Sequence, residues 1–585
     1  MGHCNGDSFG QLRVNRGGLC SAKTRLSVPL NAHHKAAVQN STARLWLPIR
    51  TYGTLTVDKG KLRVPSFTET SCKRSNFAMQ TSRSVSLLLA ATFAAIAGTA
   101  YGAQPPDVGV SGVTTVLAGT ALSGGSDAVP RPRATIRHNF RGSTRDCGSD
   151  GFPPPPGGSY CDQPDANGAI GPYYFVELVN NHYAVYTKQG IPVVQMTGGE
   201  FWGQAGVPFG VNESPVDPTI VFDPTEGRWY AATVNVLSDG VTWSQGTDLR
   251  IAVSRGDDPT EGFIGLKIPL HNVKYAGGEG PMLGYNGSGV FIVSVDYPPD
   301  FSAPTGFSLV VLPKSDLLAR KPRVDRRTVF RNIPIPAAGE WIVPAIDLDG
   351  SRQDEIVLST EGIIQYAFGT YKRNDVRGNI FNPHLDLGSG FPDKYFFGRS
   401  DYNYFFDAPQ PDPTALPLTN WYPTANAVPV VVNGQIWMVM NTVDTGTGRG
   451  SIHWLRIDAA NTAIIEEGYI GDATQSFVFP SIAANHDGDV VIGFNAVGTG
   501  PKQFASSYAV VGKTAGRKTV FGTPMLLERG SASYQLPTDV GVASWGDYSR
   551  TTLDPEDDKT FWTIQQIAVD TTHWATQITA LHIEH

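Results

Sequence analysis

The chain is poor in cysteine, in charge and in long apolar runs. Its 585 residues include only 5 Cys, and 17% are charged, with 46 Lys+Arg against 53 Asp+Glu and a net charge of −7. Nucleic-acid binders concentrate basic charge on one face, so this acidic balance argues against that class of partner. A membrane-spanning helix needs about 20 consecutive apolar residues. No apolar run reaches that length, so we predict no stable membrane span in the mature protein.

Local catalytic signatures are missing as well. The sequence contains no Gly-x-Ser-x-Gly elbow, no His-Glu-x-x-His motif, no phosphate-binding loop and no Cys/His metal cluster. A Ser-His-Asp triad needs no local spacing, so hydrolysis is not excluded. No motif, however, marks the protein as an enzyme.

Turn-forming residues are abundant, with 64 Gly and 42 Pro. Few charges and many turn residues are typical of a compact, loop-rich β protein. Residues 175–179 and 182–186 form two short alternating segments separated by Asn180-Asn181, which predicts a tight hairpin. No segment of comparable length has a clean helical period. The sequence therefore predicts an all-β fold.

A secretory signal peptide is predicted at residues 79–103, inside the chain as given. Met79 and Arg83 precede an apolar stretch from Val85 to Ala97, and small residues follow up to Gln104. A membrane anchor is the alternative interpretation. Because a signal peptide must be N-terminal, we interpret residues 1–78 as a mis-assigned, disordered upstream extension. The mature protein is then expected in the periplasm, on the cell surface or in the medium.

Two cysteines of the mature part lie close together in the sequence. Cys147 and Cys161 flank a Gly/Pro-rich loop. In a protein bound for an oxidising compartment, this spacing predicts a structural disulfide. Residues 104–164 are accordingly expected to form a linker and a disulfide loop.

A loose repeat organises residues 165–585. Units open at Pro218, Pro281 and Pro344 with a constant spacing of 63 residues, and from Pro423 to Pro480 the spacing is 57. Each unit continues with a small residue, an aliphatic residue, a polar turn and an alternating apolar strand. Such a period accommodates four short strands, which is the blade of a β-propeller. The count gives seven blades, or six with an irregular segment; a pair of β-sandwiches would show less constant spacing.

Residues just before each repeat start are the candidates for a site, because inner strands of a propeller start around its central channel. An acid pair there could act as general acid and base on a glycosidic bond, with aromatic side chains stacking on sugar rings. The structural alternative is that the acids cap turns and the tryptophans pack between blades. The predicted catalytic residues are Asp547, Tyr548 and Arg550. The predicted binding residues are Asp217, Glu279, Glu340, Trp341, Trp421 and Trp545.

Residues 347–355 have the layout of a calcium-binding loop. Oxygen-bearing side chains recur at Asp347, Asp349, Ser351 and Glu355, with a glycine at the fourth position for the bend. The segment resembles the loops of FG-GAP-type propeller repeats. It departs from them at Arg352, where those loops have a second glycine, and at its final acid. Calcium is the one predicted cofactor, against the alternative of a plain acidic turn.

The sequence resembles a group of secreted bacterial β-propeller proteins that have no agreed activity. The resemblance rests on Asn-Gly-Ala-Ile-Gly-Pro at 167–172, Asp-Pro-Thr-Ile-Val-Phe-Asp-Pro at 217–224 and Trp-Gly-Asp-Tyr-Ser at 545–549. It spans most of residues 165–568 and implies the propeller fold and export. A more distant likeness is to sialidase-type propellers, although their Ser-x-Asp-x-Gly-x-x-Trp turn is absent here.

Two functions of different classes follow from these observations. The first is an extracellular binding module that recognises a polysaccharide or a protein. The second is a polysaccharide-active glycoside hydrolase or lyase that uses acids and a tyrosine near Asp547 and Tyr548. We favour the binding module slightly, because no enzyme signature is present.

Overall fold

The structure is a computed structural model of the chain. It describes residues 56–58, 61–63, 114–117, 132–146, 163–210, 213–237, 248–271, 277–298, 304–334, 342–363, 368–387, 408–412, 414–416, 418, 427–444, 446–461, 463–536 and 545–584. The chain divides into two compact units, Met1–Gly102 and Ala103–His585. In the first unit, the described residues are a hairpin of β1 (Thr56–Asp58) and β2 (Lys61–Arg63).

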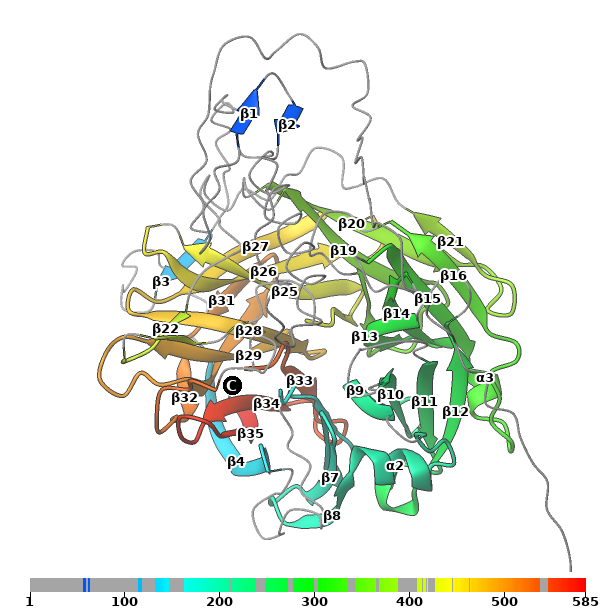
Figure 1. Ribbon diagram of the computed structural model, residues 1–585. Helices are drawn as coiled ribbons and strands as arrows, with labels where there is room; N and C mark the ends of the chain where they lie inside the picture. The colour runs from blue at the N-terminus through cyan, green and yellow to red at the C-terminus, as the bar shows by residue number, and fades with distance from the viewer. Residues whose placement is uncertain are drawn as a thin grey trace, which may run out of the picture. The chain divides into compact units, whose positions relative to one another are not determined.

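The second unit is a β-propeller, which confirms the predicted all-β fold. Its described residues contain seven groups of four antiparallel strands that follow one another around a common centre (Figure 1). Five groups stand as separate sheets, and two are joined within a ten-stranded sheet.

The first three groups follow one another in simple chain order. They are β5–β8 (Gly168–Ile170, Tyr174–Val179, His182–Thr187, Pro192–Thr197), β9–β12 (Glu213–Asp223, Arg228–Leu237, Asp248–Ser254, Phe263–Pro269) and β13–β16 (Gly277–Tyr285, Gly289–Tyr297, Gly306–Pro313, Thr328–Ile333). Short helices α2 (Gly198–Gln204), η1 (Pro259–Glu261) and α3 (Lys314–Leu317) lie in their connections. No helix among the described residues is long and apolar enough to cross a membrane.

The other four groups complete the ring. They are β17 with β19–β21 (Ile342–Pro344; Glu355–Ile363, Phe368–Arg377, His384–Leu387), β24–β27 (Val430–Val432, Gln435–Asp444, Arg449–Asp458, Ile464–Gly471), β28–β31 (Gln475–Ala484, Asp489–Gly498, Ser506–Ala515, Lys518–Phe521), and β33–β35 (Arg550–Leu553, Thr560–Ala568, Trp574–Glu584) with β4 (Arg133–Thr144). The shorter strands are β3 (Thr114–Leu117), β18 (Ile346–Asp347), β22 (Ala408–Pro409), β23 (Ala415–Leu416) and β32 (Met525–Glu528).

Strand β4 closes the ring of sheets. It pairs antiparallel with β35, the last strand of the chain, from Glu584↔Arg133 to Ala575↔Thr144. The last group is thus built from both ends of the propeller sequence. Residues 133–144, which the sequence placed in a linker, belong to the propeller.

The repeat prolines lie at bulges within the inner strands β9, β13 and β28. The residue before Pro218, Pro281 and Pro480 is Asp217, Gly280 or Phe479, and each has a left-handed φ between 50° and 58°. The register of each strand pair also shifts beside these positions. Proline has no N–H for the ladder, so a bulge accommodates it. The sequence repeat thus marks a bulge in the middle of these inner strands.

The inner strands approach one another closely near the centre. β18 lies parallel to β13 through Tyr285↔Ile346 and parallel to β24 through Ile346↔Val430, which joins two groups into the ten-stranded sheet. At Gly284 of β13, an added Cβ would meet the carbonyl oxygen of Ala345. Backbone from neighbouring groups is therefore in direct contact here, and these strands fix the positions of the side chains that face the centre.

Candidate functional site

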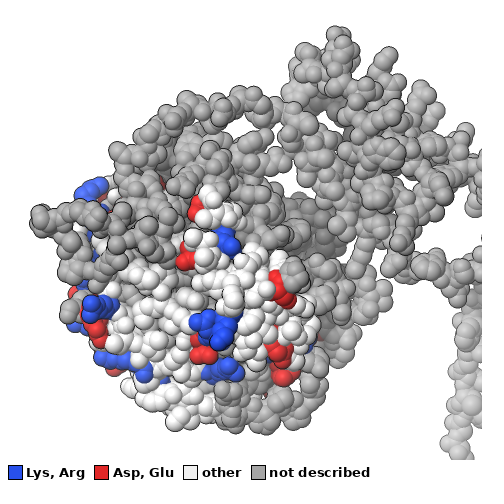
Figure 2. Space-filling view, turned by 90° about the vertical axis from the view of Figure 1, so that its left-hand side faces the viewer, with Lys and Arg blue, Asp and Glu red and all other residues white. Residues whose placement is uncertain are grey.

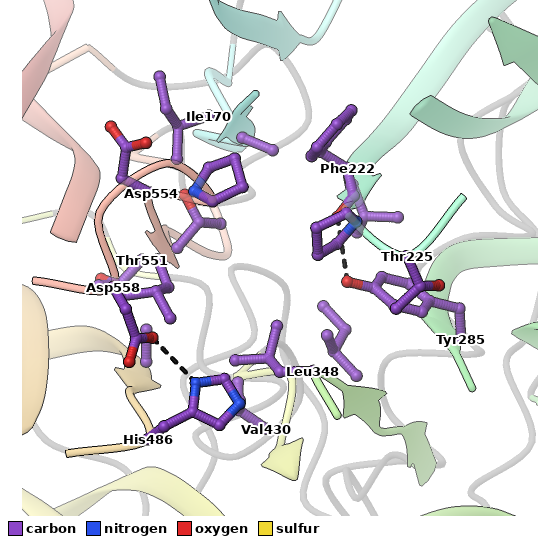
Figure 3. Close-up of a pocket in the computed structure, with 18 residues that line it drawn as sticks. Ile170, Phe222, Thr225, Tyr285, Leu348, Val430, His486, Thr551, Asp554 and Asp558 are labelled. Atoms are coloured by element: carbon purple, nitrogen blue, oxygen red, sulfur yellow. Dashed lines mark hydrogen bonds and ion pairs between the residues drawn. The ribbon is translucent and has the colours of Figure 1, made fainter. Parts of the chain in front are cut away.

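A pocket of about 430 Å³ lies where the inner strands of the propeller end. Its walls come from β5, β9, β13, β18, β24, β28 and β33 and from the turns that follow them. Apolar side chains cover most of this wall, and Figure 3 shows several of them around the open space. They include Ile170, Phe222, Leu348, Val430 and Leu553.

One side of the pocket carries a histidine between two carboxylates. His486, in the turn after β28, places Nδ1 3.0 Å from Asp558 Oδ1 and Nε2 3.3 Å from Asp349 Oδ1 (Figure 3 shows the Asp558 contact). Its carbonyl accepts a hydrogen bond from the Asn433 amide. Burial lowers the pKa of His486, but the hydrogen bonds and charges of Asp558 and Asp349 outweigh burial and raise it above 6.5. These contacts therefore link the turns that follow β18, β24, β28 and β33 at this side of the pocket.

A third carboxylate lies on the same side of the pocket as Asp558 (Figure 3). Asp554, in the turn after β33, is buried and accepts hydrogen bonds from Lys188 Nζ at 2.9 Å and from Trp562 Nε1 at 3.0 Å. The three aspartates and His486 are therefore engaged with protein partners. The pocket combines an apolar wall with a rim that carries more acidic than basic groups.

The carboxylates predicted at the starts of the inner strands do come together in part. Asp165, which the sequence reasoning did not single out, accepts a hydrogen bond from the Asp547 backbone N–H at 2.9 Å and from the Asn180 amide at 2.7 Å. Asp217 accepts from the backbone N–H of Gly280 at 2.9 Å. These bonds tie one group of strands to the next, which is the turn-capping role that the sequence left open.

Asp165 is buried close to two other carboxylates. Burial together with the charges of Asp547 and Asp217 raises its pKa well above 3.8. A carboxyl group whose pKa is raised in this way holds its proton more tightly and can serve as a proton donor. The arrangement is compatible with acid–base chemistry at this end of the inner strands.

Tyr548 and Trp545 are parts of the core. The Tyr548 hydroxyl donates to the carbonyl of Pro218 at 2.9 Å, and its ring is buried. Trp545 is fully buried and packs edge-on against Tyr534 with ring centroids 5.1 Å apart. Neither ring is placed to stack on a ligand in the pocket.

Arg550 is the first residue of the inner strand β33. It is 5% exposed, and the next residues in the chain, Thr551 and Thr552, line the pocket. Burial lowers the pKa of Arg550 to about 10, so the guanidinium remains charged at pH 7. Arg250 on β11 and Arg331 on β16 belong to the third and fourth strands of their groups and do not line the pocket.

The predicted calcium loop is folded against the pocket. Asp347 is buried and accepts a hydrogen bond from the Arg352 backbone N–H at 2.9 Å, while Asp349 contacts His486. Ser351 is exposed, and Glu355 is buried at the start of β19, where burial and the Asp347 charge raise its pKa well above 4.5. Within the described part of the chain, no three His, Cys, Asp or Glu side chains are placed to hold a metal ion. Calcium stays a prediction.

Several predicted residues cannot be placed. Glu279 lies in β13 opposite Val295, and only its backbone is described. The remaining ones lie outside the described residues: Glu340, Trp341, Trp421, Cys147 and Cys161.

The sequence reasoning missed the pocket because its members share no motif. His486 stands in Asn-His-Asp-Gly, which has the form of an ordinary turn. The only available signal was positional: each pocket residue lies a few positions after a repeat start, where an inner strand ends.

Surface charge over the described residues is mixed. Figure 2 shows basic and acidic side chains interspersed among uncharged ones, with no broad field of one sign on the described part of that face.

No protein-family model and no curated protein matches the chain. Among solved structures it is similar to a Hadza microbial sialidase (10% identity, 71% of this chain and 65% of that chain, TM-score 0.33). It is also similar to the Dos1 propeller (8% identity, 77% of this chain and 95% of that chain, TM-score 0.34). A third similar structure is an exo-β-1,3-galactanase from Phanerochaete chrysosporium (8% identity, 76% of this chain and 99% of that chain, TM-score 0.29). All three TM-scores lie below 0.5, so the propeller assignment rests on the strand pairing described above. The activities in these names belong to those proteins.

Proposed function

We propose that the protein is an extracellular binding module that holds part of a polysaccharide or protein ligand in the central pocket. The observation that carries the proposal is the pocket of about 430 Å³, with an apolar wall and one polar side. Ligand sites are typically concave, about 300–1,000 Å³ in size and mostly apolar, with a few placed polar groups. This pocket has those properties, and it lies on inner strands that packing holds in place.

The polar side supports recognition more than chemistry. His486 is held between Asp349 and Asp558, and no serine, cysteine or lysine lines the pocket as a nucleophile. Thr551 and Thr225 offer hydroxyl groups on the wall. A ligand could bury an apolar face there and hydrogen-bond at its edge.

The second candidate function is a polysaccharide-active hydrolase or lyase. It is favoured by one observation, the raised pKa of the buried Asp165 beside Asp217 and Asp547, because a carboxyl group with a raised pKa can act as a general acid. In this reading the reaction takes place at the starts of the inner strands. Export to the periplasm, cell surface or medium, and calcium at residues 347–355, are part of the proposal in either case.

The test is a binding and turnover screen of the purified protein against polysaccharides and extracellular proteins, with calcium and with chelator. Retention without product, lost in Leu348→Trp, supports the binding module, because that indole would fill the pocket. Release of reducing ends or unsaturated products, abolished by Asp165→Asn but not by Leu348→Trp, supports the enzyme instead. Binding that Leu348→Trp leaves intact would refute the pocket as the site.

A further inference from the structure

Arg550 is a buried positive charge, and two of its side-chain donor atoms lack hydrogen-bond partners. Its Nε and Nη2 are fully buried and have no hydrogen-bond acceptor in the structure. The electrostatic interactions of Arg550 are with the hydroxyl groups of Tyr548 and Tyr285, not with a carboxylate. Those hydroxyls donate to the backbone carbonyls of Pro218 and Phe222, which holds both rings in place.

Two other buried arginines of the propeller each have a carboxylate partner, although Nε of Arg456 is also without a hydrogen-bond partner. Arg456 is 1% exposed, and it donates to Glu466 Oε2 at 3.2 Å and to the Gly516 carbonyl at 3.1 Å. Arg250 is equally buried and donates to Glu213 Oε2 at 3.0 Å and to Asn235 Oδ1 at 3.1 Å. Buried charges are ordinarily paired in this way. Arg550 is the exception among these three.

The unpartnered atoms also define a geometry. Nε and Nη2 lie on the same edge of the planar guanidinium, and that edge matches the two oxygens of a carboxylate. Arg550 directly precedes Thr551 on β33, and Tyr285, whose hydroxyl interacts with it, lines the pocket. The guanidinium therefore lies behind the pocket wall, beside the lining residue Tyr285.

We propose that Arg550 binds a carboxylate of the ligand that enters the central pocket. This inference rests on the proposed binding function and adds its ligand class: a molecule with an apolar body and a terminal acidic group. The apolar wall would cover the body of the ligand, and the low dielectric there would strengthen the charge-assisted pair. The aspartates at the rim of the pocket would repel an anion, so an acidic ligand should bind only where its carboxylate contacts Arg550.

The test is calorimetric titration of the purified full-length protein with sodium glucuronate and with N-acetylglutamate. Glucose, N-acetylglutamine and sodium chloride serve as neutral and ionic controls. The wild type should bind at least one of the two acids in preference to its neutral analogue. Arg550→Met should weaken the binding of that acid about tenfold to a hundredfold, which is the loss expected when charged hydrogen bonds are removed. A sugar acid and an amino-acid side chain are distinguished by which of the two binds.

Arg456→Met is the matched control, because it removes an equally buried arginine that already has partners. It should lower stability and leave acid binding unchanged. If Arg550→Met does not fold, Arg550→Lys keeps the charge without the two-donor edge and should still weaken binding. Equal affinity of wild type and Arg550→Lys or Arg550→Met, or no preference for the acids over their neutral analogues, would overturn the inference. Failure of the proposed function is seen separately, when no ligand of the wider screen responds to Leu348→Trp.

Discussion

The closure of the propeller contains a buried histidine that should make the fold sensitive to acid. Ser143 of β4 donates to Glu177 Oε2 at 2.8 Å and lies 2.5 Å from His182 Nδ1. Thr576 of β35 and Tyr186 of β7 also donate to Glu177. These contacts connect the first group of strands to the group that both chain ends complete. Loss of this cluster would therefore open the ring at its seam.

The pKa of His182 determines how much stability the fold loses as the pH falls. Its side chain is fully buried, and burial lowers its pKa from 6.5 to about 4. Its Nε2 has no hydrogen-bond partner in the structure, so the charged form would bury an unpaired donor. Between pH 6.5 and pH 4 the unfolded chain holds this proton and the folded chain does not. Stability therefore falls as the pH falls, by about 3 kcal/mol over that window.

The assay is denaturant unfolding at pH 7, 5.5 and 4, followed by circular dichroism and tryptophan fluorescence. His182→Asn keeps a polar atom near Ser143 but does not titrate, so its free energy of unfolding should depend less on pH than that of wild type. Burial raises the pKa of Glu177, whose contribution has the opposite sign and is lost as the pH rises. Because Glu177 remains in both proteins, the difference between them isolates His182.

Ser143→Ala provides the matched control. It removes the hydroxyl contact and should cost about 1 kcal/mol at every pH. Burial alone lowers the pKa of His182, so this variant should keep the loss of stability between pH 6.5 and pH 4. Loss of the Ser143 hydroxyl raises the pKa of Glu177 further, which changes only the contribution of opposite sign. The same pH dependence in wild type and His182→Asn would refute the reasoning, since it would mean that His182 does not titrate between the two states.

Three further changes test other parts of the structure. Gly284→Ala should destabilise the propeller by about 1–3 kcal/mol in denaturant unfolding, because the added methyl would meet the Ala345 carbonyl; an unchanged midpoint would contradict the close approach. Replacing Cys147 and Cys161 by serine should lower the thermal midpoint under non-reducing conditions, with about 3 kcal/mol lost if the predicted disulfide closes the loop. No change would refute that disulfide. If calcium binds at residues 347–355, chelation should lower the midpoint of wild type and not that of Asp347→Asn; equal responses would remove the proposed metal site.

The repeat could be predicted from the sequence because it reflects backbone geometry. Pro218, Pro281 and Pro480 lie at bulges within inner strands, and the residue before each has a left-handed conformation. A proline at such a bulge is a local requirement that repeats in each unit. The spacing therefore predicted the propeller.

The predicted site was only partly informative. Asp217 and Asp547 do lie in one hydrogen-bonded region, but their backbone and side-chain bonds link strand groups, and Asp165 completes that region. Trp545 was predicted as a binding residue and is core. Strand position alone could not distinguish a side chain that faces a neighbouring group from one that faces the pocket.

The β class, the repeat and the prolines that mark bulges in inner strands could be read from the amino-acid sequence, because these features depend on residues near one another in the chain. Only the tertiary structure decided how the ring closes, since β4 and β35 are more than 400 residues apart. It also decided that His486 meets Asp349 and Asp558, and that Arg550 is buried without a partner. Burial and the meeting of distant turns depend on how all groups pack around one centre, and no local pattern encodes that arrangement.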